Sequence, residues 1–266
     1  MFATVARAAC LTADGTQVAV RHAVLADVGA PALYRHLAAD APPPLRVRLG
    51  LRRFSYDDST VKVDWALRAP IPWASSEARR SPVVHITEGV EALTRWSEQL
   101  SEGQVPEHPF LLLGQYDCVD PTRHPAGASS AWAYTHVPQR ITGDAGQDSL
   151  RGRWDDRETN AMAERMEREV EALAPGFRSL ILKRHIATPR DLQAADQNLV
   201  GGAVNGGTAQ LRQQIVLRPV PGAGRSETHV AGLYLASASA HPGGGVHGAC
   251  GRNAARAALW HAQRHR

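Results

Sequence analysis

The clearest chemical spacing in the sequence lies close to its C-terminus, in the string "HPGGGVHGACGRNAARAAL". Gly243, Gly245 and Gly248 of this string fit the pattern G-x-G-x-x-G. That pattern binds the pyrophosphate of a dinucleotide when it joins a strand to a helix and is followed by a second strand and an acidic residue. No Asp or Glu occurs after Glu227, and the residues after the glycines suffice for one helix. An ordinary Rossmann unit is therefore not expected here.

The glycine turn still has a chemistry of its own. Glycines lack a Cβ, so the backbone can approach a flat or charged ligand closely. The helix expected after Gly248 directs its free N–H groups and positive dipole end towards the turn, which favours an anion or an electron-rich oxygen. A tight strand-to-helix turn without a ligand is the alternative.

Motifs for metal and nucleophile chemistry are missing from the sequence. It has 12 His but no C-x-x-C and no H-E-x-x-H string, so no metal site is expected. It also lacks the G-x-S-x-G string of a nucleophile elbow. His136 and His247 are the candidates for a catalytic proton transfer, with a structural role as the alternative for each.

Four aromatic residues suggest a wall of a substrate pocket. Trp65, Trp73, Trp132 and Tyr134 lie in or beside segments with the pattern of strands. Large rings on one face of a sheet can line a pocket for an extended apolar substrate. Filling of the core is the alternative for each ring.

The elements that must position these residues follow from the patterns along the chain. The dipeptide Asp14-Gly15 predicts a hairpin turn, and the apolar residues from Val61 to Trp65 alternate with others as in a half-buried strand. A helix rich in opposite charges is predicted within residues 155–177. The order of strands and helices predicts a mixed α/β or α+β architecture rather than a regular βαβ series.

Charge and composition argue against a nucleic-acid-binding protein and against a membrane-spanning one. The net charge of +4 comes from arginines scattered among acidic residues, so nucleic-acid binding is not expected. No window approaches the length of uninterrupted apolar sequence that spans a bilayer, so no transmembrane segment is expected. The three cysteines lie far apart, which indicates reduced thiols and a cytoplasmic location.

Four longer strings resemble a known family. In chain order they are "VKVDWALRAPIPW", "DPTRHPAGASSAWAYTHVP", "NLVGGAVNGGTAQLRQQ" and "GLYLASASAHPGGGVHGACGRNAARAAL". Together they resemble the carboxyl-terminal half of the phytoene desaturase-like FAD-dependent oxidoreductases, in the branch of the pyridine nucleotide-disulfide oxidoreductase domain-containing proteins. The resemblance runs from about Asp14 to Leu259.

The resemblance implies an α/β fold that is α+β in its substrate part. The expected architecture is a partial FAD-binding domain of the amine oxidase/phytoene desaturase type, without the amino-terminal Rossmann unit, joined to a mixed-sheet substrate domain. Residues 1–40 would hold late strands of the flavin domain, and residues 41–225 would form the substrate domain. Residues 226–266 would supply the return strand, the glycine loop and the final helix of the flavin domain.

The resemblance also implies a flavin site and an activity. The residues expected near the flavin are Ser237, Gly243, Gly244, Gly245, Val246, His247 and Gly248. The activity would be that of a desaturase or dehydrogenase that transfers hydride from an apolar substrate to FAD. A complementing chain with a G-x-G-x-x-G Rossmann unit, or a second copy of this chain, would supply the missing half. The alternative is a non-enzymatic module that has lost FAD and binds a ligand or a partner.

Overall fold

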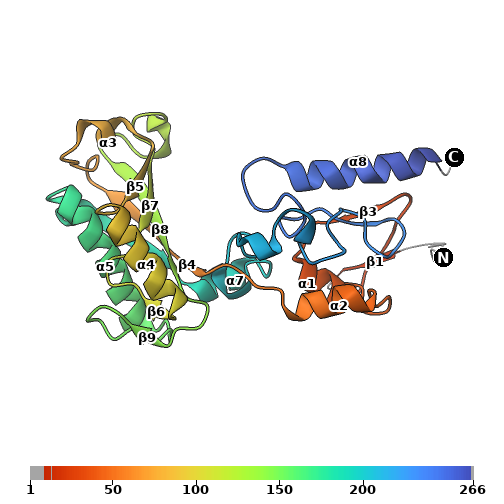
Figure 1. Cartoon of the computed structure of the whole chain (residues 1–266). Coiled ribbons are helices and arrows are strands. Elements are labelled where there is room, and N and C mark those ends of the chain that lie inside the picture. The colour runs from red at the N-terminus through yellow and green to blue at the C-terminus, as the bar shows by residue number, and fades with distance from the viewer. Residues whose placement is uncertain (1–8, 13, 265–266) are drawn as a thin grey trace. The chain divides into compact units, whose positions relative to one another are not determined.

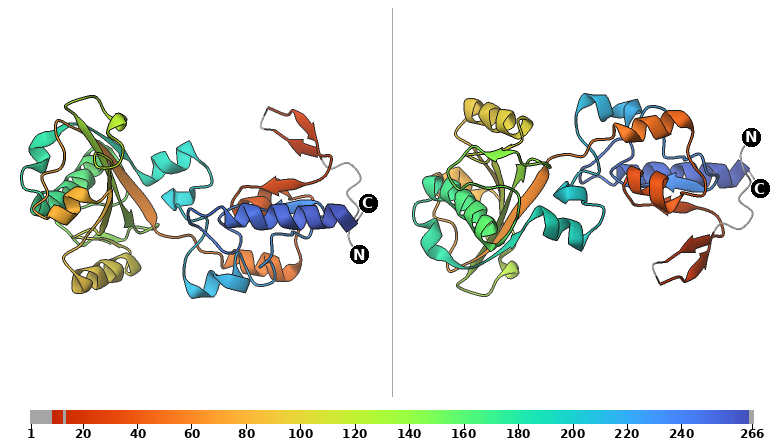
Figure 2. Two further views of the ribbon diagram at one scale, coloured as in Figure 1. Left: turned by 90° about the horizontal axis from the view of Figure 1, so that it is seen from above. Right: turned by 90° about the horizontal axis from the view of Figure 1, so that it is seen from below.

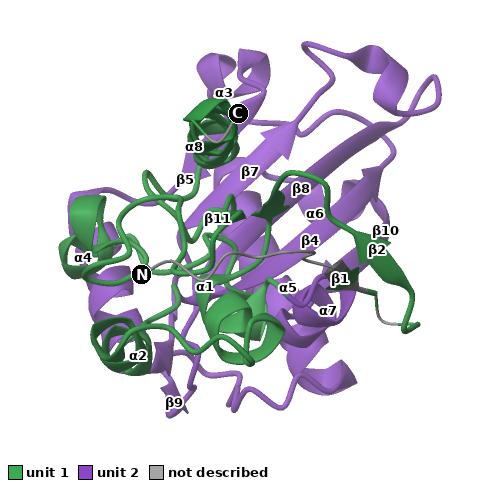
Figure 3. Cartoon of the chain, turned by 90° about the vertical axis from the view of Figure 1, so that its right-hand side faces the viewer, with its two compact units in different colours: residues 1–57, 198–266 green, residues 58–197 purple. Residues whose placement is uncertain are grey.

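The computed structural model describes residues 9–12 and 14–264, which divide into two compact units (Figures 1 and 3). Unit 1 comprises Met1–Asp57 and Asn198–Arg266, and unit 2 comprises Asp58–Gln197. The sequence-based boundaries after residues 40 and 225 therefore both fall inside unit 1. One reason is that the helix α2 (Leu45–Arg52) buries Val47 and Leu51 in the core of that unit.

Unit 2 is built on a sheet of five strands in the order β10-β4-β8-β7-β5. All four pairings in it are antiparallel, whereas a mixed sheet was expected. Successive strands such as β7 and β8 pair directly, so the chain must reverse between them. A separate parallel pair joins two short strands. The strands are β4 (Ser59–Leu67), β5 (Val83–Ile86), β7 (Leu111–Gln115), β8 (Ser129–Val137) and β10 (Ile181–Ala187), with β6 (Gln104–Val105) and β9 (Gly143–Asp144) in the parallel pair.

Two helices lie on opposite faces of the five-stranded sheet (Figure 2). The face under α5 (Asp156–Leu173) is the main core, where Met162 and Met166 of the helix pack against buried strand residues. Asp155 caps α5 by accepting the N–H of Glu158 at 2.9 Å, so the helix predicted here is confirmed. The other face carries α4 (Val90–Ser101). Shorter helices complete the unit: α3 (Ser76–Arg80), η2 (Pro121–Arg123), α6 (Phe177–Leu180) and α7 (Pro189–Ala195).

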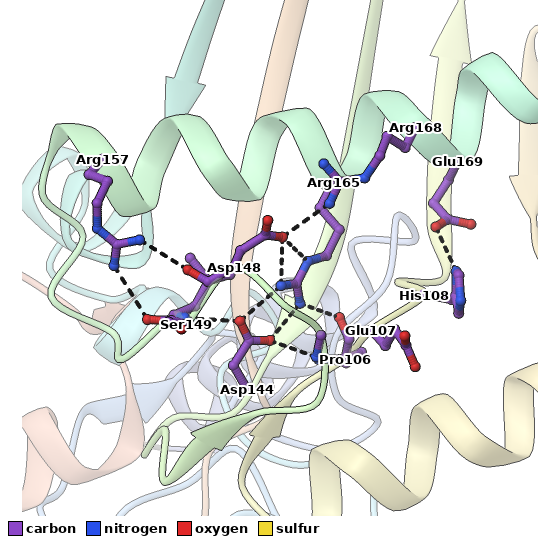
Figure 4. A network of polar contacts seen from close by, with 12 residues as sticks. Pro106, Glu107, His108, Asp144, Asp148, Ser149, Arg157, Arg165, Arg168 and Glu169 are labelled. Carbon is purple, nitrogen blue, oxygen red and sulfur yellow. Dashed lines mark hydrogen bonds and ion pairs between the residues drawn. The ribbon is translucent and has the colours of Figure 1, made fainter.

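A buried ion-pair network fixes α5 to the loop that follows β9 (Figure 4). The guanidinium of Arg165 is almost fully buried and contacts Asp144 at 2.8 Å and Asp148 at 2.7 Å. It also donates to the carbonyl oxygen of Pro106 at 2.7 Å. Arg168 adds an exposed contact with Asp148 at 3.0 Å. Each of the three guanidinium nitrogens of Arg165 thus has an acceptor, which marks the network as part of the scaffold.

Unit 1 brings the two ends of the described chain together (Figure 1). Asp14 and Gly15 lie between the antiparallel strands β1 and β2, so the predicted hairpin is confirmed. β3 pairs in parallel with β11, far away in sequence, and α8 follows β11. The elements are β1 (Ala9–Leu11), β2 (Gln17–Ala19), β3 (Val24–Ala26), α1 (Ala30–Ala32), η1 (Leu33–Leu37), α2, η3 (Val200–Gly202), η4 (Leu211–Gln213), η5 (Ile215–Leu217), β11 (Leu233–Leu235) and α8 (Ala249–Arg264).

The mixed α/β architecture expected from the sequence is confirmed by these elements. Unit 1 combines a parallel strand pair with helices, whereas unit 2 combines an antiparallel sheet with helices. Within the described part of the chain, no helix is both long and apolar enough to cross a membrane.

Candidate functional site

The segment that contains the seven expected flavin residues leads from β11 into α8. β11 lies parallel to β3, with Tyr234 opposite Leu25. Beyond the strand, the hydroxyl of Ser237 donates to the carbonyl oxygen of Val28 at 2.7 Å and accepts the N–H of Ser239 at 3.2 Å. Ser237 therefore ties the start of the glycine segment to the end of β3. The structure brings all seven residues together in one stretch of unit 1.

The inner half of the glycine turn packs against other parts of unit 1. Gly243 is buried and has a φ of +106°, and a Cβ on it would lie 3.0 Å from Nε of Arg218. A Cβ on Gly244 would lie 2.8 Å from the side-chain oxygen of Asn205. The sulfur of Cys250 lies 3.3 Å from the carbonyl oxygen of Gly243. Internal packing thus explains why glycine occupies positions 243 and 244.

The outer half of the turn is open to solvent. Gly245, Val246, His247 and Gly248 are all exposed, and Val246 is fully so. A Cβ on Gly248 would meet nothing within 4 Å, and its φ of +60° is one that glycine adopts freely. Packing within unit 1 does not account for this glycine, so the outer half is the part that can face a ligand.

The open face of the turn ends at the N-terminus of α8. Nδ1 of His247 accepts the N–H of Ala249 at 3.0 Å, so this histidine caps the helix. The N–H of Arg252 bonds to the carbonyl oxygen of Gly248 at 3.0 Å as the helix begins. Other N–H groups of the first turn have no acceptor within the helix, and the dipole end there is positive. This end of α8 therefore favours a negatively charged or electron-rich group.

One residue of this region escaped the sequence analysis. Arg218 is 1% exposed, and its hydrogen bonds connect Ala238, in the segment after β11, with residues 205–208. Burial lowers the pKa of Arg218 below its ordinary value, and the negative charge of Asp57 opposes that effect. The signal in the sequence was a single arginine inside the apolar string "IVLRPVPG".

The four rings expected to form a substrate wall do not share one face. Trp65 and Trp73 are each 2% exposed and belong to the main core of unit 2. Their indole N–H groups donate to Glu167 at 3.0 Å and Gln115 at 2.9 Å. In the register of the sheet, Trp65 pairs with Ala131 rather than with Trp132, so the two tryptophans point to opposite faces.

Trp132 and Tyr134 lie on the sheet face that carries α4. Both are half-buried, and their rings are parallel at a centroid distance of 6.1 Å. The indole N–H of Trp132 donates to the hydroxyl of Tyr116 at 3.0 Å. This pair offers apolar ring surface outside the closed core, as a substrate wall requires.

His136 continues the same aromatic row. Its ring makes an edge contact with Tyr134 at 5.6 Å, and Trp96 of α4 lies 6.5 Å away. Its Nδ1 is 3.4 Å from the hydroxyl oxygen of Thr60. His136 belongs to unit 2 and His247 to unit 1, so the two candidates for proton transfer are held by different units. In the described parts of the chain, no group of three or more His, Cys, Asp or Glu side chains could hold a metal ion.

Comparison with known proteins identifies relatives of the chain. No protein-family model matches it. It is 34% identical over 186 residues to "Pyridine nucleotide-disulfide oxidoreductase domain-containing protein 2" of Rattus norvegicus, covering 69% of this chain and 31% of that protein. With the protein of the same name from Mus musculus it is 36% identical over 159 residues, covering 59% of this chain and 26% of that protein.

A solved structure has a similar fold. A crystal structure described as an oxidoreductase from Methanosarcina mazei matches with a TM-score of 0.55 and 13% sequence identity. The match covers 98% of this chain and 47% of that chain. The chain thus corresponds to about half of the solved structure, and its matches cover about a third or less of its curated relatives. These findings confirm the resemblance seen in the sequence: the chain is related, over about two thirds of its length, to a segment of pyridine nucleotide-disulfide oxidoreductase domain-containing protein 2.

Proposed function

We propose that the chain is one part of an FAD-dependent oxidoreductase, a desaturase or dehydrogenase, that acts on an apolar substrate. The names of the curated relatives and of the solved structure support oxidoreductase chemistry. One observation carries the proposal: the outer half of the glycine turn is exposed between a parallel strand pair and the N-terminus of α8. Strand, glycine turn and helix start together suit a flat ligand with negative charge.

The residues of the turn fit a flavin ring. Because Gly248 has no Cβ and open space beside it, the ring could approach the backbone closely. The first turn of α8 provides N–H groups and a positive dipole end. Ser237 and Arg218 hold the segment that enters the turn. When bound, FAD would supply hydride acceptance from the substrate. The protein's part is to orient the ring and to stabilise negative charge beside it.

The half-buried rings of unit 2 support an apolar substrate. Trp132, Tyr134 and His136 form a row along one face of β8, and Trp96 of α4 adjoins it. Trp65 and Trp73 support the sheet from within the core rather than contacting substrate. Of the two candidates for proton transfer, His136 is the one that lies in this aromatic row.

A complementing polypeptide, or a second copy of the chain, is expected to cover part of unit 1. Among the described strands, β3 pairs only with β11, which leaves its other edge open. Leu25 on this strand is 42% exposed, and Leu211 and Val216 in the same unit are 85% and 70% exposed. The relatives are much longer than the matched segment, which agrees with a further part that adds to this surface.

A non-enzymatic module without FAD is the second candidate function. Its supporting observation is that internal contacts with Arg218 and Asn205 already explain Gly243 and Gly244. Such a module would bind an apolar ligand or a partner and would stay colourless in every combination.

Co-expression with a polypeptide that carries a strand–G-x-G-x-x-G–helix unit distinguishes the flavoenzyme from the module without FAD. The proposal predicts that the purified pair shows flavin absorbance, and that Gly248→Val abolishes it. Gly127→Val is the matched control, because Gly127 also has a positive φ, +79°, and open space around its Cβ position but lies in unit 2. A colourless, well-folded pair, or equal loss of flavin in both variants, would contradict the proposal.

A further inference from the structure

Arg218 joins two segments of unit 1 that are distant in sequence. Its Nε and Nη2 donate to the carbonyl oxygen of Ala238 at 3.0 and 2.7 Å. Its Nη1 donates to Thr208, and Nη2 also donates to Asn205, each at 2.9 Å. One planar guanidinium thus holds the backbone after β11 against the glycine-rich segment 201–208.

The same side chain forms the floor of the glycine turn. Nε of Arg218 would lie 3.0 Å from a Cβ on Gly243, so the backbone at this glycine rests on the guanidinium. The side chain of Asn205, whose carbonyl oxygen Arg218 binds, occupies the space beside Gly244 in the same way and donates to Asp57. Arg218 and Asn205 thus pack directly against Gly243 and Gly244, the residues that lead into the open half of the turn.

The charge of Arg218 is unusual for a buried arginine. Its partners are backbone carbonyl groups, and none of the hydrogen bonds that it makes with described residues goes to a carboxylate. By contrast, the buried Arg165 of unit 2 contacts Asp144 and Asp148 directly. The charge of Asp57 opposes the effect of burial on the pKa of Arg218, but a buried cation whose hydrogen-bond partners are all neutral is still costly.

We propose that Arg218 is the positioning residue of the flavin-facing turn: it clamps the backbone after β11 to the glycine-rich segment 201–208 and keeps a fixed positive charge beneath the turn. This inference rests on the proposed function. The clamp fixes where Gly245–Gly248 lie, and the charge favours the reduced, negatively charged form of the flavin over the oxidised, neutral form. Arg218 acts through the backbone that it holds.

Three variants separate the clamp from the charge. Arg218→Met removes both, Arg218→Lys keeps the charge but loses the planar fork, and Arg225→Met makes the same chemical change at an exposed arginine of unit 1. In the flavin-free chain, hydrogen exchange of residues 205–208 and 238–244 is expected to rise about tenfold or more in Arg218→Met, since hydrogen bonds to a charged group are lost. Arg218→Lys should show a smaller rise, and Arg225→Met should match the wild type.

The second readout is the relative affinity of the co-expressed pair for reduced and oxidised flavin. In Arg218→Met the ratio of the affinity for reduced flavin to that for oxidised flavin should fall about tenfold, which lowers the two-electron reduction potential of the bound flavin by about 30 mV. Arg218→Lys should keep most of the wild-type ratio. Unchanged exchange in Arg218→Met would overturn the clamp. Changed exchange with an unchanged ratio would reduce Arg218 to a structural residue. A wild-type pair without flavin would refute the proposed function and with it the cofactor role of Arg218, while the exchange data would still decide on the clamp.

Discussion

Two buried arginines show how differently single residues are stabilised in the two units. Arg165 is neutralised by Asp144 and Asp148, and its third partner is the carbonyl oxygen of Pro106. The hydrogen bonds of Arg218 go to carbonyl groups, and the negative charge of Asp57 acts on it as well. The first arrangement is that of a scaffold, because every charge finds an opposite one within the same network. The second leaves the guanidinium without a hydrogen-bonded carboxylate beside the segment that leads to the glycine turn.

Arg165→Met is expected to destabilise unit 2 by about 3–5 kcal/mol, because two carboxylates, one of them nearly fully buried, would lose their partner. Arg168→Met is the control: its side chain is 50% exposed, so its loss should cost below about 1 kcal/mol. Urea unfolding followed by tryptophan fluorescence measures this, since every tryptophan except Trp260 lies in unit 2. Equal effects of the two changes would contradict the assignment.

Asp144 should also give unit 2 a dependence on acid. Burial raises its pKa, but hydrogen bonds and charge from Arg165, with the N–H groups of Leu150 and Gly146, outweigh burial and hold the pKa below the ordinary 3.8. The stabilising effect is therefore complete at neutral pH and is lost as the pH falls from about 4 through the lowered pKa of the folded state. Asp144→Asn should reduce stability at neutral pH. Its urea midpoint should also fall less than that of the wild type as the pH is lowered below about 4. Parallel curves for the two proteins would argue against this.

At the scale of elements, the position of α8 determines where the glycine turn can point. The hydroxyl of Tyr234 in β11 lies 2.9 Å from Nδ1 of His261 in the last turn of α8. Near the other end of the helix, Cys250 and Ala254 are buried. β11 and α8 therefore touch at a point far from the turn, which holds the helix along its length.

Tyr234→Phe removes this bond and should weaken the attachment of α8 by about 1 kcal/mol. Hydrogen exchange of amides near His261 should become roughly fivefold faster, because that is the factor by which local opening increases. Tyr34→Phe is the control, because Tyr34 is also a buried tyrosine of unit 1 and its ring contacts His229. An equal change near His261 in both variants would show that the bond does not hold the helix.

At the scale of the whole molecule, patterns of local origin could be predicted from the sequence. The charged helix within residues 155–177 and the hairpin at Asp14-Gly15 depend on periodicity and turn chemistry, and both are present. The boundaries of the units differ from the expected ones because long-range packing places α2 in unit 1, and contacts between distant segments leave no local pattern in the sequence.

The site could be predicted only where it is continuous in sequence. The glycine turn was found because its residues follow one another, whereas Arg218 acts through carbonyl groups of residues 205–208 and 238, which carry no side-chain signal. The faces of Trp65 and Trp132 became known only with the register, in which Asp64 pairs with Trp132. Residues that become neighbours from separate segments of the chain can be identified only from the folded structure.

The central claim is that the outer half of the glycine turn lies against a flavin. Hydrogen exchange of the co-expressed pair, with and without FAD, tests it most directly. The account predicts protection by FAD at residues 244–251, while the exposed turn around Gly127 in unit 2 exchanges equally in both states. FAD that binds to the pair but leaves exchange at residues 244–251 unchanged would contradict it.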